Sequence, residues 1–331
     1  MREAASDGLE HCRHAHRVGV GAERFAYNAP MPHFTPIPPT KLAALNRASV
    51  QLWLPHASLS HCVRAVVVRS TLGIGRDWPQ AWQYNYFPAT PLCSFGWFIA
   101  GHSELIDAGC PAAPDSPAQR MPRAYFSGPF TRPTVSRNTP EGHGVMLLLL
   151  PDAVHALTGL NPGEWIDRFE SLPAALGPQW QALSDAVLAA PDDATRVRLI
   201  GDFLSPRWQD ARARTGAPTV MRLHDWARAL AMRAAVSGVG RSLRQAERRV
   251  KGWTGLPMRE LRGMGRAEQA FFRTVTDGEG AVNWADIAAD TGYADQSHLS
   301  RETRRITGFP PGELRRRIVE DESFWVYRIW T

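Results

Sequence analysis

The chain has 331 residues, of which 44% are hydrophobic, and its formal net charge is +6. This length exceeds a single small helical bundle and predicts two or three domains with ordinary cores. The longest uninterrupted apolar run, Val145 to Leu150, is far too short to span a bilayer, so no membrane-spanning helix is predicted.

The four cysteines, Cys12, Cys62, Cys93 and Cys110, are widely separated and form no CxxC pair. This spacing indicates neither a zinc site nor a disulfide framework, and it suits a reducing compartment. The first twenty residues carry charges and no apolar core, so no signal peptide is predicted. We therefore expect a cytoplasmic protein that holds no metal and no cofactor.

Residues 1–40 combine mixed charge with clustered prolines, and this composition predicts a disordered tail. His11, Cys12, His14 and His16 could in principle bind a metal there. Histidines in such a tail are more often simply solvated, so they are not taken as a metal site.

Between residues 50 and 150, short apolar runs alternate with Pro and Gly, which favours an antiparallel sheet folded into a barrel or sandwich. No GxGxxG or GxxxxGK[ST] motif is present, so nucleotide binding loses support. From residue 152 the apolar periodicity becomes helical. Residues 41–204 are therefore predicted to form a β-barrel-like sensor or dimerisation domain with packed helices, followed by a linker at 205–218.

A small barrel can enclose one ligand, so aromatic and imidazole side chains of this region are candidates for a ligand site. The candidates are Trp53, Trp82, Tyr84, Trp97 and His102, together with His143. For any one of them the more ordinary role is a core tryptophan or a surface histidine. A metal-dependent barrel enzyme would need clustered histidines with a nearby carboxylate, which this region lacks, so no catalytic residues are predicted.

Residues 282–317 predict a helix, a tight turn and a second helix. Asn283 can cap the first helix, and Gly292 can end it in the left-handed conformation. Asp295 is placed to cap the second helix, whose apolar stripe includes Leu299 and Ile306. Side chains suited to reading base edges or gripping phosphates fill its other face: Gln296, Ser297, His298, Ser300, Arg301, Arg304 and Arg305.

The run IAADTGYADQSHLSRETRRITGFPPGELR resembles the second helix-turn-helix of AraC-type transcriptional regulators. Residues 223–266 resemble the first one, although Ala246 and Val250 stand where the family usually has larger side chains. By matched positions and helix geometry, the groove-facing set of this first unit is Arg244, Gln245, Glu247 and Arg248. A helix at 259–273 would connect the two units.

The resemblance implies an α+β protein: a β-rich, barrel-like N-terminal domain, an all-α DNA-binding domain with two helix-turn-helix motifs at 219–320, and a tail at 321–331. It implies a sequence-specific transcription regulator whose partner is double-stranded DNA. A small-molecule effector, RNA polymerase and a second copy of the chain are candidate partners. Residues 221–320 hold 18 Lys and Arg against 12 Asp and Glu, a basic excess that suits a polyanion. The alternative is a barrel-fold enzyme or small-molecule-binding protein whose helical tail serves protein contacts.

Overall fold

The structure is a computed structural model that describes residues 32–74, 78–215, 222–237, 242–276 and 282–330. The predicted disorder of residues 1–31 lies outside these ranges. The rest of that predicted tail is partly ordered, because residues 34–37 pair with the next strand. None of the helices in the described ranges combines the length and apolarity that a membrane crossing requires.

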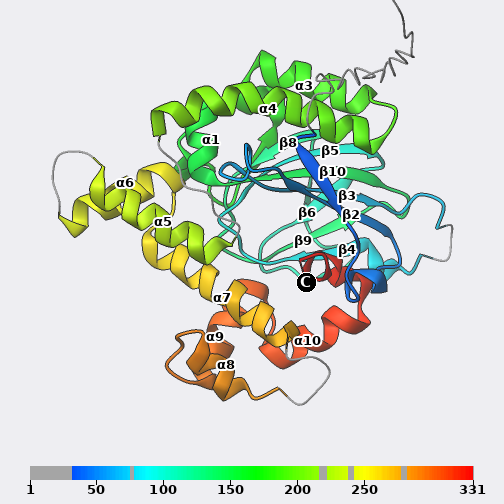
Figure 1. Ribbon diagram of the computed structural model, residues 1–331. Coiled ribbons are helices and arrows are strands. Elements are labelled where there is room, and N and C mark those ends of the chain that lie inside the picture. The colour runs from blue at the N-terminus through cyan, green and yellow to red at the C-terminus, as the bar shows by residue number, and fades with distance from the viewer. Residues whose placement is uncertain (1–31, 75–77, 216–221, 238–241, 277–281, 331) are drawn as a thin grey trace, which may run out of the picture. The chain divides into compact units, whose positions relative to one another are not determined.

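Eleven strands in the described ranges form two antiparallel sheets, which confirms the β-rich character predicted for the N-terminal region (Figure 1). The larger sheet has seven strands in the order β1 (Phe34–Ile37), β2 (Ser49–Pro55), β3 (Val63–Ser70), β10 (His143–Leu149), β5 (Cys93–Ala100), β8 (Ala124–Ser127) and β11 (Phe169–Ser171). The smaller sheet has four, in the order β4 (Tyr84–Phe87), β9 (Thr134–Asn138), β6 (Ser103–Ile106) and β7 (Ala118–Arg120).

The central strands of the larger sheet bury side chains on both faces. Along β10, Val145 and Leu147 belong to one hydrophobic cluster, whereas Met146 packs against another. Strand β3 behaves in the same way, since Val66 joins the first cluster and Val67 the second. Because side chains alternate across a strand, the nearly continuous apolar run of these strands is what a sheet covered on both faces requires.

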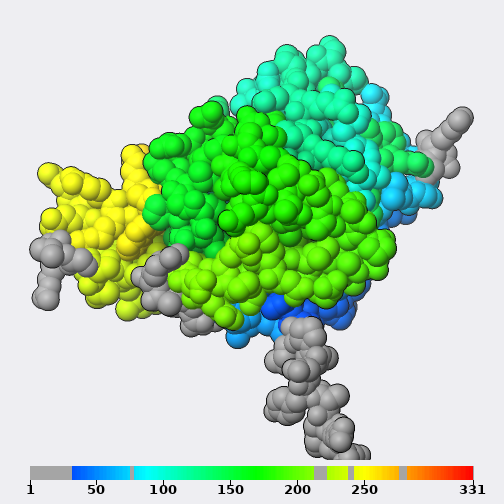
Figure 2. All heavy atoms as spheres, turned by 90° about the horizontal axis from the view of Figure 1, so that it is seen from above, coloured from blue at the N-terminus to red at the C-terminus, as the bar shows by residue number. Residues whose placement is uncertain are grey.

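Helices after residue 150 cover the first face, as the helical periodicity predicted. They are α1 (Pro151–Thr158), the 3₁₀ helix η3 (Pro162–Trp165), α2 (Leu172–Leu176), α3 (Pro178–Ala189) and α4 (Asp193–Thr215). The ring of Phe95 stacks on that of Trp180 at 4.8 Å. The indole of Trp97 donates a 3.1 Å hydrogen bond to Ser184. In Figure 2 these helices form the continuous green surface over this side of the sheet.

The remaining helices form the helix-turn-helix region. They are α5 (Leu223–Val236), α6 (Leu243–Thr254), α7 (Met258–Thr276), α8 (Trp284–Asp290), α9 (Gln296–Thr307) and α10 (Pro311–Glu320). The linker predicted at 205–218 is wrong over its first eleven residues, because α4 continues to Thr215. Pro206, which favoured a linker in the prediction, lies inside this helix. Leu204 and Trp208 on either side of it are buried in the core, and their burial favours the continuous helix.

The prediction of a C-terminal tail at 321–331 is also wrong, because its described residues are folded. It contains the 3₁₀ helix η4 (Glu322–Phe324) and α11 (Trp325–Arg328), and both contact β4. Phe324 is fully buried and Trp325 is 5% exposed. The segment is part of the hydrophobic cluster on the second face of the sheet, together with Leu314 and Ile318 of α10.

Candidate nucleic-acid interface and ligand cavity

The second helix-turn-helix has the turn that its sequence predicts. The side chain of Asn283 accepts hydrogen bonds from the backbone N–H groups of Ala285, at 3.1 Å, and Asp286, at 3.4 Å, which caps α8. After α8, Gly292 adopts φ +75°, a conformation that favours glycine. Tyr293 then turns inward and is 5% exposed. Burial raises the pKa of its phenol to about 12.

Helix α9 is fixed at both ends and along one face. The carboxylate of Asp295 accepts a 2.6 Å hydrogen bond from the backbone N–H of His298, and Gly308 ends the helix at φ +87°. Leu299 and Ile306 are buried. These contacts fix which face of α9 is turned outward.

The outward face of α9 carries most of the predicted base-reading and phosphate-binding residues. Gln296, Ser297, Arg301 and Arg304 are exposed, whereas Ser300 is half-buried. Within the described part of the chain, Arg301 and Arg304 make no ion pair. Their guanidinium groups are therefore available to an added partner.

Two of the predicted residues on α9 have other contacts. The imidazole of His298 accepts a 3.3 Å hydrogen bond from the N–H of Ala294, and its ring meets Tyr293 edge-on at 5.3 Å. It therefore holds the turn. Arg305 pairs with Glu260 of α7 at 3.0 Å and with Glu302 at 3.1 Å.

These pairs also set the charge state of Arg305. Burial alone lowers the pKa of Arg305, but its hydrogen bond to Glu302 and the charges of Glu302 and Glu260 more than offset burial, so its pKa is raised. Arg305 joins α9 to α7 as a permanent cation.

The first helix-turn-helix presents a similar outward face on α6. The hydroxyl of Ser242 accepts a 3.3 Å hydrogen bond from the backbone N–H of Gln245, and Val250 is 1% exposed. The predicted groove-facing residues are all exposed: Arg244, Gln245, Glu247 and Arg248. Residues 238–241 of the glycine-rich turn before α6 lie outside the described ranges.

Helix α7 joins the two units, close to the predicted range of 259–273. It has 19 residues, which corresponds to a length of about 28 Å. Successive major grooves on one side of a duplex are about 34 Å apart, centre to centre. A spacer of this length is compatible with two recognition helices entering neighbouring grooves.

A cavity of about 1470 Å³ lies between the two sheets and extends toward α7, α10 and residues 325–330. Four of the six predicted ligand-site residues line it, namely Trp82, Trp97, His102 and His143. Trp53 and Tyr84 are not among its lining residues. Tyr84 is 5% exposed and belongs to the buried side chains, the ordinary role considered for such residues.

The sequence reasoning missed the polar residues of this cavity, above all Arg69 on β3 and Asn85 on β4. The guanidinium of Arg69 donates a hydrogen bond to the side-chain oxygen of Asn85. Burial lowers the pKa of Arg69 to about 10, although the charge of Glu322 opposes the shift. The alternation of side chains along β3 could have predicted that Arg69 points inward, because Arg69 lies on the same face of the strand as the buried residues Ala65 and Val67.

Among the described residues, no group of three or more His, Cys, Asp or Glu side chains is placed to hold a metal ion. His11, Cys12, His14 and His16 lie outside the described ranges.

Comparison with protein families gives one match, a helix-turn-helix domain over residues 235–317, about a quarter of the chain. This range runs from the end of α5 into α10 and contains both recognition helices. A search of curated proteins gave no match.

Comparison with solved structures gives low-scoring likenesses. An apo variant of ToxT from Vibrio cholerae has 12% identity and a TM-score of 0.36, covering 75% of this chain and 95% of that one. ToxT from the same organism with a bound unsaturated fatty acid has 12% identity and a TM-score of 0.31, covering 70% and 92%. The AraC-like transcriptional activator CuxR has 13% identity and a TM-score of 0.28, covering 90% and 92%.

Proposed function

We propose that the chain is a sequence-specific DNA-binding regulator of transcription of the AraC type with an effector-sensing N-terminal domain, because residues 235–317 match a helix-turn-helix domain. The observation that carries the proposal is the pair of capped helices α6 and α9, which present arginine and glutamine side chains outward and are joined by α7. Arginine pairs well with guanine, and glutamine with adenine, in a major groove.

The residues on α6 and α9 are assigned different roles according to whether their side chains are exposed or already bound to a neighbouring residue. Gln296 and Arg301 on α9, and Arg244 and Gln245 on α6, are proposed as base readers because they are exposed. Arg304 is proposed as a phosphate contact. His298 and Arg305 are proposed to position α9, since each is already bound to a neighbouring residue.

Selection of bound sequences from random duplex DNA tests this function. We expect a motif with two half-sites whose centres lie about one helical turn apart, because each protomer carries two recognition helices. Arg301→Ala should lose preference at one position of the motif, while Arg198→Ala, on the distant helix α4, should leave the motif unchanged. Failure of the wild-type chain to enrich any sequence would refute the proposal.

The cavity between the sheets is the proposed effector site. It is large enough for a small molecule, and it combines apolar walls with buried polar groups, the composition typical of ligand sites. Fluorescence of Trp82, which lines the cavity, should report ligand entry. In a screen of small molecules, hits should lose their signal when Asn85 is replaced by Leu, and a signal that survives this change would place the ligand elsewhere.

We further propose that the sensor domain extends to the end of α4 and that the DNA-binding domain begins at α5. Self-association and contact with RNA polymerase are proposals carried by the family resemblance alone. Sedimentation of the full chain with and without the selected duplex measures the number of protomers on each site.

A further inference from the structure

The C-terminal segment, residues 321–330, follows the DNA-binding domain directly and enters the edge of the cavity between the sheets. Its side chains are buried to an extent unusual for charged residues: Glu322 is 2% exposed and Arg328 is 1% exposed. Trp325, Tyr327 and Trp330 line the cavity. The segment therefore forms part of the wall of the proposed effector site.

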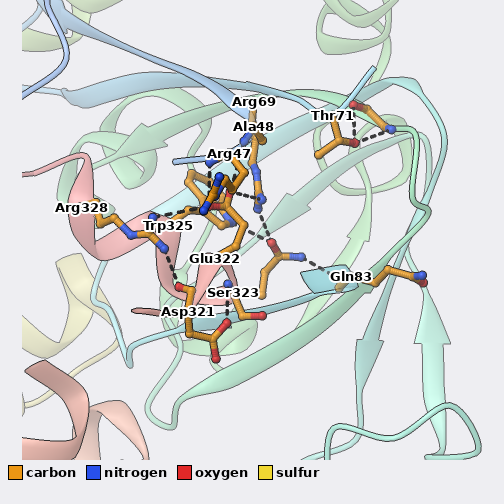
Figure 3. Close-up of polar contacts among 12 residues, drawn as sticks. Arg47, Ala48, Arg69, Thr71, Gln83, Asp321, Glu322, Ser323, Trp325 and Arg328 are labelled. Carbon is orange, nitrogen blue, oxygen red and sulfur yellow. Dashed lines mark hydrogen bonds and ion pairs between the residues drawn. The ribbon is translucent and has the colours of Figure 1, made fainter. Parts of the chain in front are cut away.

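The carboxylate of Glu322 is surrounded by hydrogen-bond donors (Figure 3). It accepts from the guanidinium of Arg69 at 3.0 Å and from that of Arg328 at 3.4 Å. It also accepts from the backbone N–H groups of Arg47 at 2.9 Å and Ala48 at 3.4 Å. A buried carboxylate needs such donors, because loss of water is costly for a charge that is left unpaired.

Trp325 binds Asn85, the second polar residue of the cavity. Its indole N–H donates a 2.7 Å hydrogen bond to the side-chain oxygen of Asn85. Its ring lies under the guanidinium of Arg69, 4.5 Å from ring centroid to Cζ. The ring of Phe324 stacks on Tyr86 at 4.8 Å. The segment thus satisfies both Arg69 and Asn85, the two residues that an added ligand would also have to satisfy.

The type of contact bears on whether the segment can leave. Burying an ion pair removes both charges from water, and this desolvation cost offsets much of the attraction between Arg69 and Glu322. The segment also buries apolar side chains, since Phe324, Trp325 and Tyr327 belong to the hydrophobic cluster on the second face of the sheet. Release therefore loses the burial of these side chains as well as the ion pair, and a bound partner has to supply that free energy.

The segment is also coupled to the second recognition helix. Helix α10 begins at Pro311, four residues after α9 ends at Thr307, and it continues into residue 321. The last turn of α9 is tied to the sensor domain by a 2.7 Å hydrogen bond from the N–H of Ala89 to the carbonyl of Ile306. Because the segment continues α10 directly, its movement away from Arg69 would remove the contacts that hold the end of α10, whereas the bond between Ala89 and Ile306 does not involve the segment.

We propose that residues 321–330 are a releasable latch. Docked on Arg69 and Asn85, the latch closes the cavity and holds the second helix-turn-helix against the sensor domain; DNA binding favours the released state. This inference rests on the proposed function, because it assigns the regulation of the same DNA-binding domain. Coupling is reciprocal, so any ligand that favours release must be bound more tightly once release has occurred.

Hydrogen exchange on the full wild-type chain tests the latch without any substitution. Addition of the selected duplex should accelerate amide exchange in residues 321–330 by about tenfold, while strands β3 and β10 keep their rates. Unchanged or slower exchange in the segment would overturn the proposal. If no duplex is selected at all, the proposed function has failed, and the variants below decide the latch separately.

Glu322→Gln removes the charge that Arg69 holds while it keeps the size of the side chain. The matched control is Glu320→Gln, since among the described residues Glu320 pairs only with Arg316, at 2.7 Å on the exposed face of α10. Glu322→Gln should accelerate exchange of residues 321–330 about tenfold and tighten DNA binding about threefold, and the control should change neither. If exchange in β3 and β10 rises as much as in the segment, or if DNA binding weakens, Glu322 is a core residue and the latch is refuted.

Discussion

The buried carboxylate of Asp152, in the first turn of α1, accepts a 3.0 Å hydrogen bond from the indole of Trp226 in α5. Its second oxygen pairs with Arg233 at 2.9 Å. One acid of the sensor domain thus holds two residues of the first helix-turn-helix. The position suits a carboxylate, because the amino end of a helix favours negative charge.

Asp152→Asn should therefore lower the free energy of unfolding by about 2 kcal/mol, since it leaves the guanidinium of Arg233 without its counter-charge. Chemical denaturation of the full chain measures the effect. The control, Asp202→Asn, breaks the pairs that the exposed Asp202 makes with Arg198 and His33 and should change stability by less than about 0.5 kcal/mol. Equal effects would contradict the structural role assigned to Asp152.

Arg301→Ala and Arg305→Ala should distinguish a residue that reads a base from a residue that holds α9 against α7. Loss of a bidentate base contact costs about 1–3 kcal/mol at one base pair, so Arg301→Ala should flatten one motif position without changing thermal stability. Arg305→Ala removes the pairs to Glu260 and Glu302 and should lower stability by about 1 kcal/mol. If Arg301→Ala unfolds the chain, Arg301 is not a base reader.

The salt dependence of DNA affinity counts the phosphates that the protein neutralises. A plot of log affinity against log salt should fall steeply, and Arg304→Ala should make its slope shallower by about 0.9 if this residue holds one phosphate. Arg316 and Arg317 pair with Glu320 and Glu313, so their replacement should change the slope less. Titrations of one duplex at several salt concentrations provide the slopes, and a flat plot for the wild type would argue against DNA as the partner.

Tyr293 should make the stability of the chain depend on pH in alkaline solution. Burial raises its pKa to about 12 in the folded state, above its ordinary value of 10.0. Between these values the folded state keeps a proton that the unfolded state has lost, so stability falls as pH rises through this window. Tyr293→Phe removes this contribution, and denaturation at pH 9 and pH 11 should show a smaller pH effect in the variant. Identical pH effects would exclude the phenol as the cause.

Local signals predicted the helix-turn-helix units well. The caps at Asn283 and Asp295 and the turn at Gly292 depend on contacts within two to four residues, which a short stretch of sequence contains. The exposed faces of α6 and α9 follow from the apolar stripes opposite them. The second unit was therefore readable from its own residues, whereas the first was expected from the resemblance of residues 223–266 to a helix-turn-helix.

Residues 321–330 were misread because their contacts are not local. Glu322 meets Arg69, which precedes it by 253 residues, and only the fold brings the two together. The same holds for Asn85, whose role in the cavity depends on its pairing with Trp325. The end of α4 was missed for a related reason, since burial of Trp208 outweighed the turn signal of Pro206.

The continuation of α4 to Thr215 sets a strict limit on how far the two domains can separate. Helix α5 begins at Leu223, eight residues later, and an extended chain of that length spans at most about 29 Å. A tether this short keeps an undocked partner at a local concentration in the millimolar range. Even a weak docking contact would then be re-formed readily, so inserting a long flexible sequence after Thr215 should shift the balance toward separated domains without altering any contact.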